Sequence, residues 1–99
     1  MATKIRKSDV LPGEGRTFPG AGPRSIAVYH KDDGTFVALS ADCPHKHCDV
    51  VWNSNEKTWD CPCHASRFKP DGRLIQGPAV DPLRKLSSVD LGEELEVNE

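Results

Sequence analysis

Hydrophobic and polar residues alternate over short stretches of the chain, and this two-residue period predicts β-strands. The stretch SIAVYH places Ile26 and Val28 on one face and Ala27 and Tyr29 on the other. The turn-forming sequence KDDG follows, and TFVALS then continues the alternation. Together these stretches predict a β-hairpin over residues 25–40.

Shorter candidate strands follow, separated by polar turns such as NSNEK and KPDG. They are DVVW (49–52), TWDC (58–61), SRF (66–68), RLIQG (73–77), LRKLSSVDL (83–91) and ELEVNE (94–99). The stretch 11–24 contains a candidate edge strand at 16–18, but its glycines and prolines favour a loop. Eight glycines and eight prolines in the chain leave little room for a helix. Short strands at regular spacing predict an all-β fold, a sandwich or a barrel.

Length and charge narrow the classes of function. With 99 residues we expect one domain, 1–99. A chain of this size buries only roughly 60–65% of its unfolded surface, so a covalent cross-link or a bound metal would help it fold. The net charge of −2 gives no reason to expect binding to nucleic acid. No apolar run approaches the ~18 residues of a membrane span, and the start, MATKIRKSDV, lacks the features of an export signal. We therefore expect a cytoplasmic protein, with a periplasmic location or a longer native chain as the alternatives, and a monomer.

The cysteines and histidines are strongly clustered, because all four cysteines and three of the four histidines lie within residues 43–64. The first group is Cys43, His45, His47 and Cys48, and the second is Cys61, Cys63 and His64. Both groups fall on expected loops at strand ends, where functional sites are common.

Two chemistries compete for these residues. Zinc takes tetrahedral sulfur and nitrogen ligands, but a Cys2His2 site would leave two cysteines unexplained. The alternative is a two-iron cluster with two thiolates on one iron and two imidazoles on the other. Such a cluster needs one cysteine and one histidine from each loop, which the spacings Cys-x-His and Cys-x-x-His supply.

The sequences CPHKHC, CPCHASRF and GPA resemble the motifs of the Rieske iron–sulfur family. The resemblance covers roughly residues 24–97 and implies layered antiparallel sheets, with a small cluster-binding subdomain (about 41–80) inserted in a β base. More narrowly, the chain is similar to Rieske domains fused to flavin-dependent oxidoreductases and to small stand-alone bacterial Rieske proteins.

The resemblance assigns the ligands of a Rieske [2Fe–2S] cluster by position. Cys43 and Cys61 would bind one iron, and His45 and His64 the other. It also implies a disulfide between Cys48 and Cys63, which would join the two loops. Closing a loop of about fifteen residues contributes on the order of 3 kcal/mol in the chain-entropy model.

Residues around the cluster would tune it. Ser66 occupies the place of a family serine that donates to a bridging sulfide, and Gly77, Pro78 and Ala79 would form a lid that excludes water. Phe68 stands where high-potential members have a tyrosine that donates to a ligand thiolate. Loss of that donor implies a reduction potential below that of the quinol-oxidising members.

The tip of the first loop suggests the kind of partner. Quinol-oxidising members carry an apolar residue and a glycine where this chain has Lys46 and His47, so we expect a redox protein partner, acidic or a flavoprotein, and not a quinol. We expect His47 to be no ligand, His30 to be structural, and Trp52 and Trp59 to pack across paired strands.

These features predict a soluble one-electron carrier between an oxidoreductase and an acceptor, which by itself is not an enzyme. The alternatives are a small electron-relay subunit of a larger oxidase, as in arsenite oxidases, and a zinc-structured module. Ferredoxins of Rieske dioxygenase systems are related, but they lack the two extra cysteines, Cys48 and Cys63.

Overall fold

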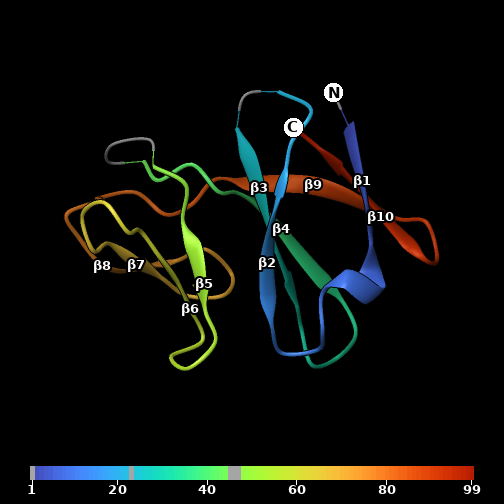
Figure 1. Ribbon diagram of the computed structural model, residues 1–99, viewed down its shortest axis with the longest axis horizontal. Helices are drawn as coiled ribbons and strands as arrows, with labels where there is room; N and C mark the ends of the chain where they lie inside the picture. The colour runs from blue at the N-terminus through green and yellow to red at the C-terminus, as the bar shows by residue number, and fades with distance from the viewer. Residues whose placement is uncertain (1, 23, 45–47) are drawn as a thin grey trace.

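The computed structural model describes residues 2–22, 24–44 and 48–99, and it is built almost entirely of antiparallel strands (Figure 1). The elements are β1 (Ala2–Arg6), the short 3-10 helix η1 (Lys7–Asp9), β2 (Gly15–Pro19), β3 (Ser25–His30), β4 (Phe36–Ser40), β5 (Val51–Asn53), β6 (Thr58–Asp60), β7 (Arg67–Phe68), β8 (Leu74–Gln76), β9 (Lys85–Asp90) and β10 (Glu94–Asn98). The all-β prediction is confirmed. Among the described residues, no helix is long and apolar enough to cross a membrane.

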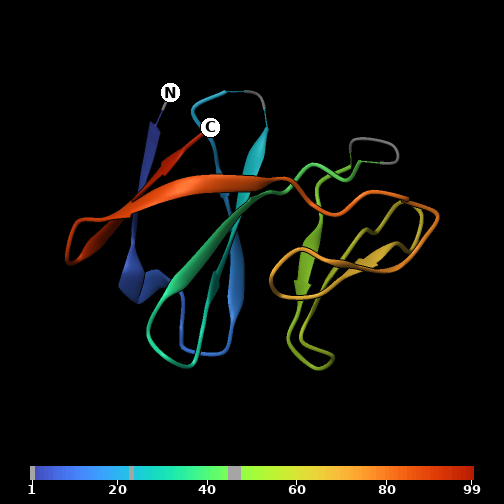
Figure 2. The ribbon, with the colours of Figure 1, turned by 180° about the vertical axis from the view of Figure 1, so that it is seen from behind.

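The strands form a base and a smaller inserted sheet. The base has the order β1-β10-β9-β4-β3-β2, and β9 connects its two halves by pairing with β4 near its start and with β10 further along. The small sheet, β5-β6-β7-β8, lies between β4 and β9 in the sequence. Figures 1 and 2 show it at one end of the molecule, beside the base. This arrangement agrees with the expected insertion in a β base.

The β3–β4 hairpin has two buried faces and therefore separates two cores. Ile26, Val28 and Ala38 face the core of the base, together with Ile5, Val10, Leu86, Leu95 and Val97. Ala27 and Leu39 lie on the other face and pack in a core with Val50, Cys43, Cys61, Trp59, Phe68 and Leu83. The alternation read from the sequence thus describes a hairpin shared by the base and the small sheet.

Aromatic residues fill the junction between the base and the small sheet. Trp52 and Trp59 are cross-strand partners with ring centroids 4.9 Å apart, as expected, and the Tyr29 ring lies 5.4 Å from that of Trp52. Gly15 in β2 passes so close that a Cβ atom there would lie 2.8 Å from both indoles. His30 is structural, since its Nδ1 lies 2.8 Å from the carbonyl oxygen of Val10, which accepts the hydrogen bond.

Two edge strands of the base differ from the sequence prediction. The preference for a loop over residues 11–24 is wrong at 15–19, where β2 pairs with β3 along its whole length. Pro19 is tolerated because it ends an edge strand. Strand β1, whose only buried residue is Ile5, was not predicted from the sequence.

Candidate metal centre

The candidate site is built from two loops of matching construction. The first loop (43–48) and the second loop (61–66) both follow an aspartate and begin with Cys-Pro. The backbone N–H of Cys43 donates to the oxygen of Cys48 at 2.8 Å, and that of Cys61 donates to the oxygen of Ser66 at 2.8 Å. Each loop of six residues is therefore closed at its base by a backbone hydrogen bond between its first and last residues.

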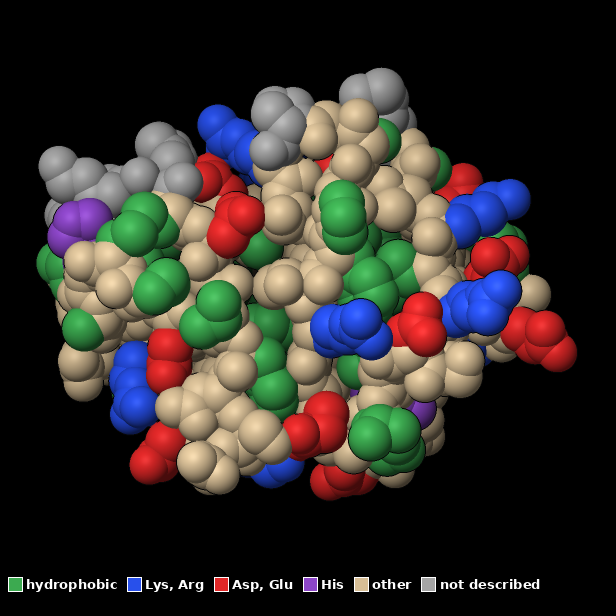
Figure 3. Space-filling model, viewed as in Figure 1, with side chains coloured by type: hydrophobic (Ala, Val, Ile, Leu, Met, Phe, Trp, Pro, Cys, Tyr) green, Lys and Arg blue, Asp and Glu red, His purple; other side chains and the backbone are tan. Residues whose placement is uncertain are grey.

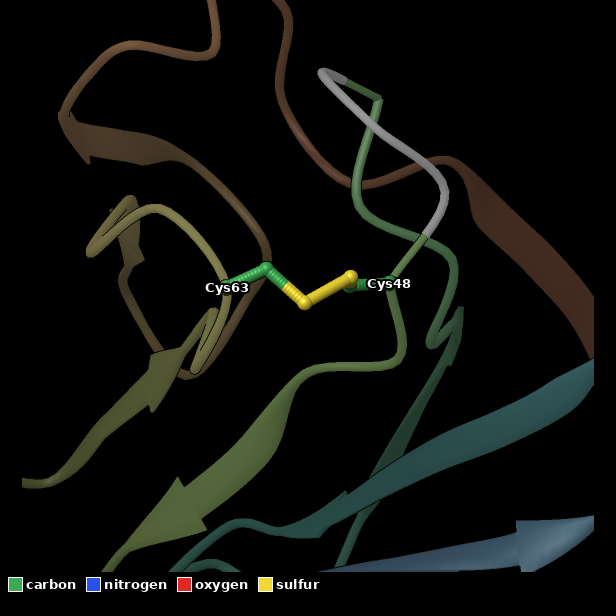
Figure 4. Close-up of a disulfide and its surroundings, with 2 residues drawn as sticks. All are labelled: Cys48 and Cys63. Carbon is green, nitrogen blue, oxygen red and sulfur yellow. A yellow bond between two sulfur atoms is a disulfide. The ribbon is translucent and has the colours of Figure 1, made fainter.

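A disulfide joins the two loops. Cys48 at the end of the first loop is bonded to Cys63 in the second, with Cα atoms 6.4 Å apart (Figure 4). The pairing implied by the family resemblance is confirmed. The bond spans 15 positions of the chain, including the β5–β6 hairpin, so it limits how far the two loops can separate.

The two remaining cysteines are buried at the loop bases. Cys43 is 0% exposed and Cys61 is 1% exposed, and both belong to the core that contains Val50, Trp59 and Phe68. His64 is exposed. Figure 3 shows hydrophobic side chains at the surface of the small-sheet end. The second loop thus offers one buried sulfur and one solvent-facing imidazole.

A third segment is held against the second loop. The fully buried Ser66 accepts a hydrogen bond from the backbone N–H of Ala79 at 3.0 Å, so its own hydroxyl proton is not used in this contact. Ala79 is buried, whereas Gly77 and Pro78 are exposed. Phe68, two residues after Ser66, is fully buried in β7. These are the residues expected to surround the cluster.

Three of the predicted site residues, His45, Lys46 and His47, lie outside the described residues. Within the described part of the chain, no three His, Cys, Asp or Glu side chains gather as a metal site. The donors that are described still fit an iron–sulfur cluster, because soft thiols suit it and each loop base carries one buried cysteine outside the disulfide.

Comparison with known proteins decides the family. Residues 2–87 match the Rieske [2Fe-2S] domain. The chain belongs to the Rieske [2Fe-2S] family. Its cofactor is accordingly the Rieske-type [2Fe–2S] cluster, and Rieske domains of this type are electron-transfer carriers and not catalysts.

Relatives of this Rieske domain occur within longer proteins. It is 42% identical over 82 residues to the Rieske 2Fe-2S iron-sulfur protein YhfW of Bacillus subtilis, covering 83% of this chain and 16% of that protein. It is 41% identical over 89 residues to the cytochrome b6-f complex iron-sulfur subunit 1 of Synechocystis, covering 85% of this chain and 50% of the subunit. The domain therefore spans half of one relative's length and much less of the other's.

Two solved structures share the fold over most of both chains. The plasma membrane Rieske protein PetC3 from Synechocystis superposes with a TM-score of 0.73 at 26% identity, covering 88% of this chain and 87% of that one. The ferredoxin of carbazole 1,9a-dioxygenase from Nocardioides aromaticivorans superposes with a TM-score of 0.69 at 26% identity, covering 96% of each chain.

Two arginine side chains beside the site could not be identified from the sequence. Arg24 contacts Asp42, and Arg67 contacts Asp60, so each aspartate that precedes a loop cysteine has an arginine partner. The repeated Asp-Cys-Pro was the available signal for the aspartates. Nothing local in the sequence pointed to the arginines, which come from other strands or strand ends.

Proposed function

We propose that this Rieske domain carries single electrons between an oxidoreductase and an acceptor, with its cluster held by Cys43, His45, Cys61 and His64. The observation that carries the proposal is the pair of buried cysteines, Cys43 and Cys61, at the bases of two matched, disulfide-linked loops. When bound, the [2Fe–2S] cluster supplies one-electron redox chemistry.

The residues of the chain support this role by holding a rigid, mostly dry site. Burial of Cys43 and Cys61 among apolar side chains keeps water from the thiolate side. The Cys48–Cys63 disulfide limits loop movement, and Ser66 ties down the 77–79 lid through Ala79. The exposed imidazole of His64 offers a route from the cluster to a partner at the surface.

The ligand assignment is tested by loading the full chain and counting iron and acid-labile sulfide. We expect about two of each per chain and the absorption and EPR signals of a Rieske centre. Cys61→Ser and His64→Ala should lose the cluster, whereas His47→Ala, our matched control, should retain it. Stoichiometric zinc without sulfide would contradict the proposal.

We expect the partner to be a redox protein. A flavoprotein is favoured by the sequence resemblance to Rieske domains fused to flavin-dependent oxidoreductases, and by the positive charge of Lys46 in the first loop. The second candidate is an electron-relay subunit of a larger complex, favoured by the 41% identity to a cytochrome b6-f complex subunit. Affinity purification of the native protein separates the two, since a relay subunit co-purifies with a large stoichiometric complex and a mobile carrier does not.

The expected cytoplasmic location and monomeric state remain predictions, as does the extent of the domain. One structural relative is named a plasma membrane protein. Fractionation of native cells tests the location, and sedimentation of the loaded protein tests the monomer.

A further inference from the structure

We propose that two aspartate–arginine pairs, Asp42–Arg24 and Asp60–Arg67, set the reduction potential of the cluster from the thiolate side of the two loops. The inference rests on the proposed function, because it takes Cys43 and Cys61 to be the thiolate ligands. It assigns a role to four side chains that touch no metal.

The first observation is the position of the aspartates. Asp42 directly precedes Cys43, and Asp60 directly precedes Cys61. One peptide unit holds consecutive Cα atoms about 3.8 Å apart. Each carboxylate therefore lies within roughly 10 Å of the sulfur of the next residue, about the screening length at 0.1 M salt.

The second observation is that each aspartate meets an arginine. Arg24, directly before β3, places Nη1 2.5 Å from Oδ2 of Asp42. Arg67 in β7 is the cross-strand partner of Asp60 and places Nε 3.4 Å from Oδ1. A negative charge next to each proposed thiolate ligand is thus offset by a positive charge from another segment.

The third observation is that the carboxylates are more buried than the guanidinium groups. The Asp42 and Asp60 side chains are 9% and 23% exposed, against 59% and 36% for Arg24 and Arg67. Charge that is shielded from solvent acts more strongly on its surroundings. Removing an arginine therefore leaves the less screened member of its pair beside the cluster.

Neighbouring groups keep the Asp60 carboxylate in place when Arg67 is removed. Asp60 also accepts hydrogen bonds from Asn53 Nδ2 at 2.8 Å and Thr58 Oγ1 at 2.6 Å. Near the first pair, Ser25 donates to Asp49, which lies in a β-bridge with Asp42, so that region holds a further carboxylate. Arg24 is a charged partner of Asp42, and Arg67 is a charged partner of Asp60.

The sign of the effect follows from electrostatics. Reduction adds one negative charge to the cluster, so a nearby carboxylate opposes reduction and a nearby guanidinium favours it. Arg24→Gln and Arg67→Gln should lower the reduction potential, and Asp42→Asn and Asp60→Asn should raise it. Each change should alter the equilibrium constant for reduction by about threefold to tenfold at low salt.

The experiment is protein-film voltammetry of the loaded full chain at pH 8, at low and high salt. The double variant Asp60→Asn/Arg67→Gln should return close to the wild-type potential, and Arg67→Lys should restore much of the loss in Arg67→Gln. Lys57→Gln breaks an ion pair with Glu14 elsewhere and is the matched control for charge. It should leave the potential unchanged.

The results distinguish this inference from the proposed function. The inference would be overturned if both arginine variants kept the EPR signal and the reduction potential of the wild type. It would also be overturned if Asp60→Asn and Arg67→Gln shifted the reduction potential in the same direction. Should one variant fail to retain its cluster, the other pair gives the same test. A wild-type chain that assembles no [2Fe–2S] cluster would refute the proposed function itself.

Discussion

Ser66 and Phe68 occupy successive inward positions at the end of the second loop, and both are fully buried. Ser66 uses its oxygen to hold Ala79, while Phe68 fills the core shared with Trp59. Because Phe68 carries no hydroxyl group, it contributes packing at this position and no hydrogen bond to a sulfur.

Phe68→Tyr should raise the reduction potential of the loaded protein, because a hydroxyl group near a ligand thiolate stabilises the reduced cluster. Voltammetry across pH 6 to 10 measures the shift. Phe36→Tyr, a change of the same kind in the core of the base, is the control and should leave the potential unchanged. No rise in Phe68→Tyr would mean that the side chain does not reach the ligand thiolate.

At the scale of elements, β2 supports the small sheet in addition to extending the base. Its edge contacts β5, and Gly15 lies under the two indoles of Trp52 and Trp59. A side chain at this point would force the two sheets apart. The glycine is therefore needed for close approach and not for a turn.

Gly15→Ala should destabilise the protein by about 1–3 kcal/mol, because the added methyl group overlaps both indoles. For a domain of about this length, each kcal/mol lowers the melting temperature by roughly 4–8 °C. Thermal unfolding followed by circular dichroism measures the change. Gly22→Ala is the matched control, because a Cβ there meets nothing within 4 Å, and an equal loss in both variants would contradict the packing argument.

Removal of the disulfide should weaken the site without abolishing it. Cys48→Ser/Cys63→Ser should lower stability by about 3 kcal/mol, as the constraint on the unfolded chain is lost. Iron release to a chelator should become faster because the two loops can separate. Cys43→Ser should instead prevent cluster assembly. If the disulfide variant also contained no iron after loading, the disulfide would be essential for assembly, and the prediction would be wrong.

For the whole molecule, contacts link the base and its inserted segment at both ends of the β3–β4 hairpin. At one end, Glu14 in the loop before β2 pairs with Lys57 and accepts a hydrogen bond from Ser54 in the β5–β6 turn. At the other end, Arg24 just before β3 and Ser25 in β3 contact Asp42 and Asp49 around the first loop.

The Glu14 contact predicts a pH dependence. Hydrogen bonds from Lys57 and Ser54 hold the pKa of Glu14 below its usual value. A carboxyl whose pKa is lower in the folded state stabilises the protein above its unfolded pKa, and this stabilisation is lost as pH falls through the folded value. The melting temperature should therefore drop between pH 6 and pH 3.5, and less steeply in Glu14→Gln.

The control is Glu56→Gln, which changes an exposed acidic residue in the β5–β6 turn. It should preserve the wild-type pH profile. If Glu14→Gln has the same slope as the wild type, Glu14 does not couple the base to the small sheet.

Several features could be predicted from the sequence because they depend on neighbours along the chain. Alternation placed Ile26 and Val28 opposite Ala27, and covalent spacing pointed to a pair of cysteine- and histidine-bearing loops. The family resemblance then supplied the Cys48–Cys63 pairing, which the structure contains. The ligand set that it also supplied stays a prediction.

Tertiary structure decided what local patterns do not encode. Strand β2 has a sequence that favours a loop, yet pairing with β3 and packing under two indoles outweigh that weak preference. The contacts Arg24–Asp42 and Ser66–Ala79 join segments 18 and 13 positions apart, and they form only once the hairpin and the small sheet are packed. Sequence by itself determined the donor atoms and their spacing along the chain, because these are covalent. The charges and hydrogen bonds around those donors were decided by the fold, because only the complete set of packed strands brings distant residues into contact.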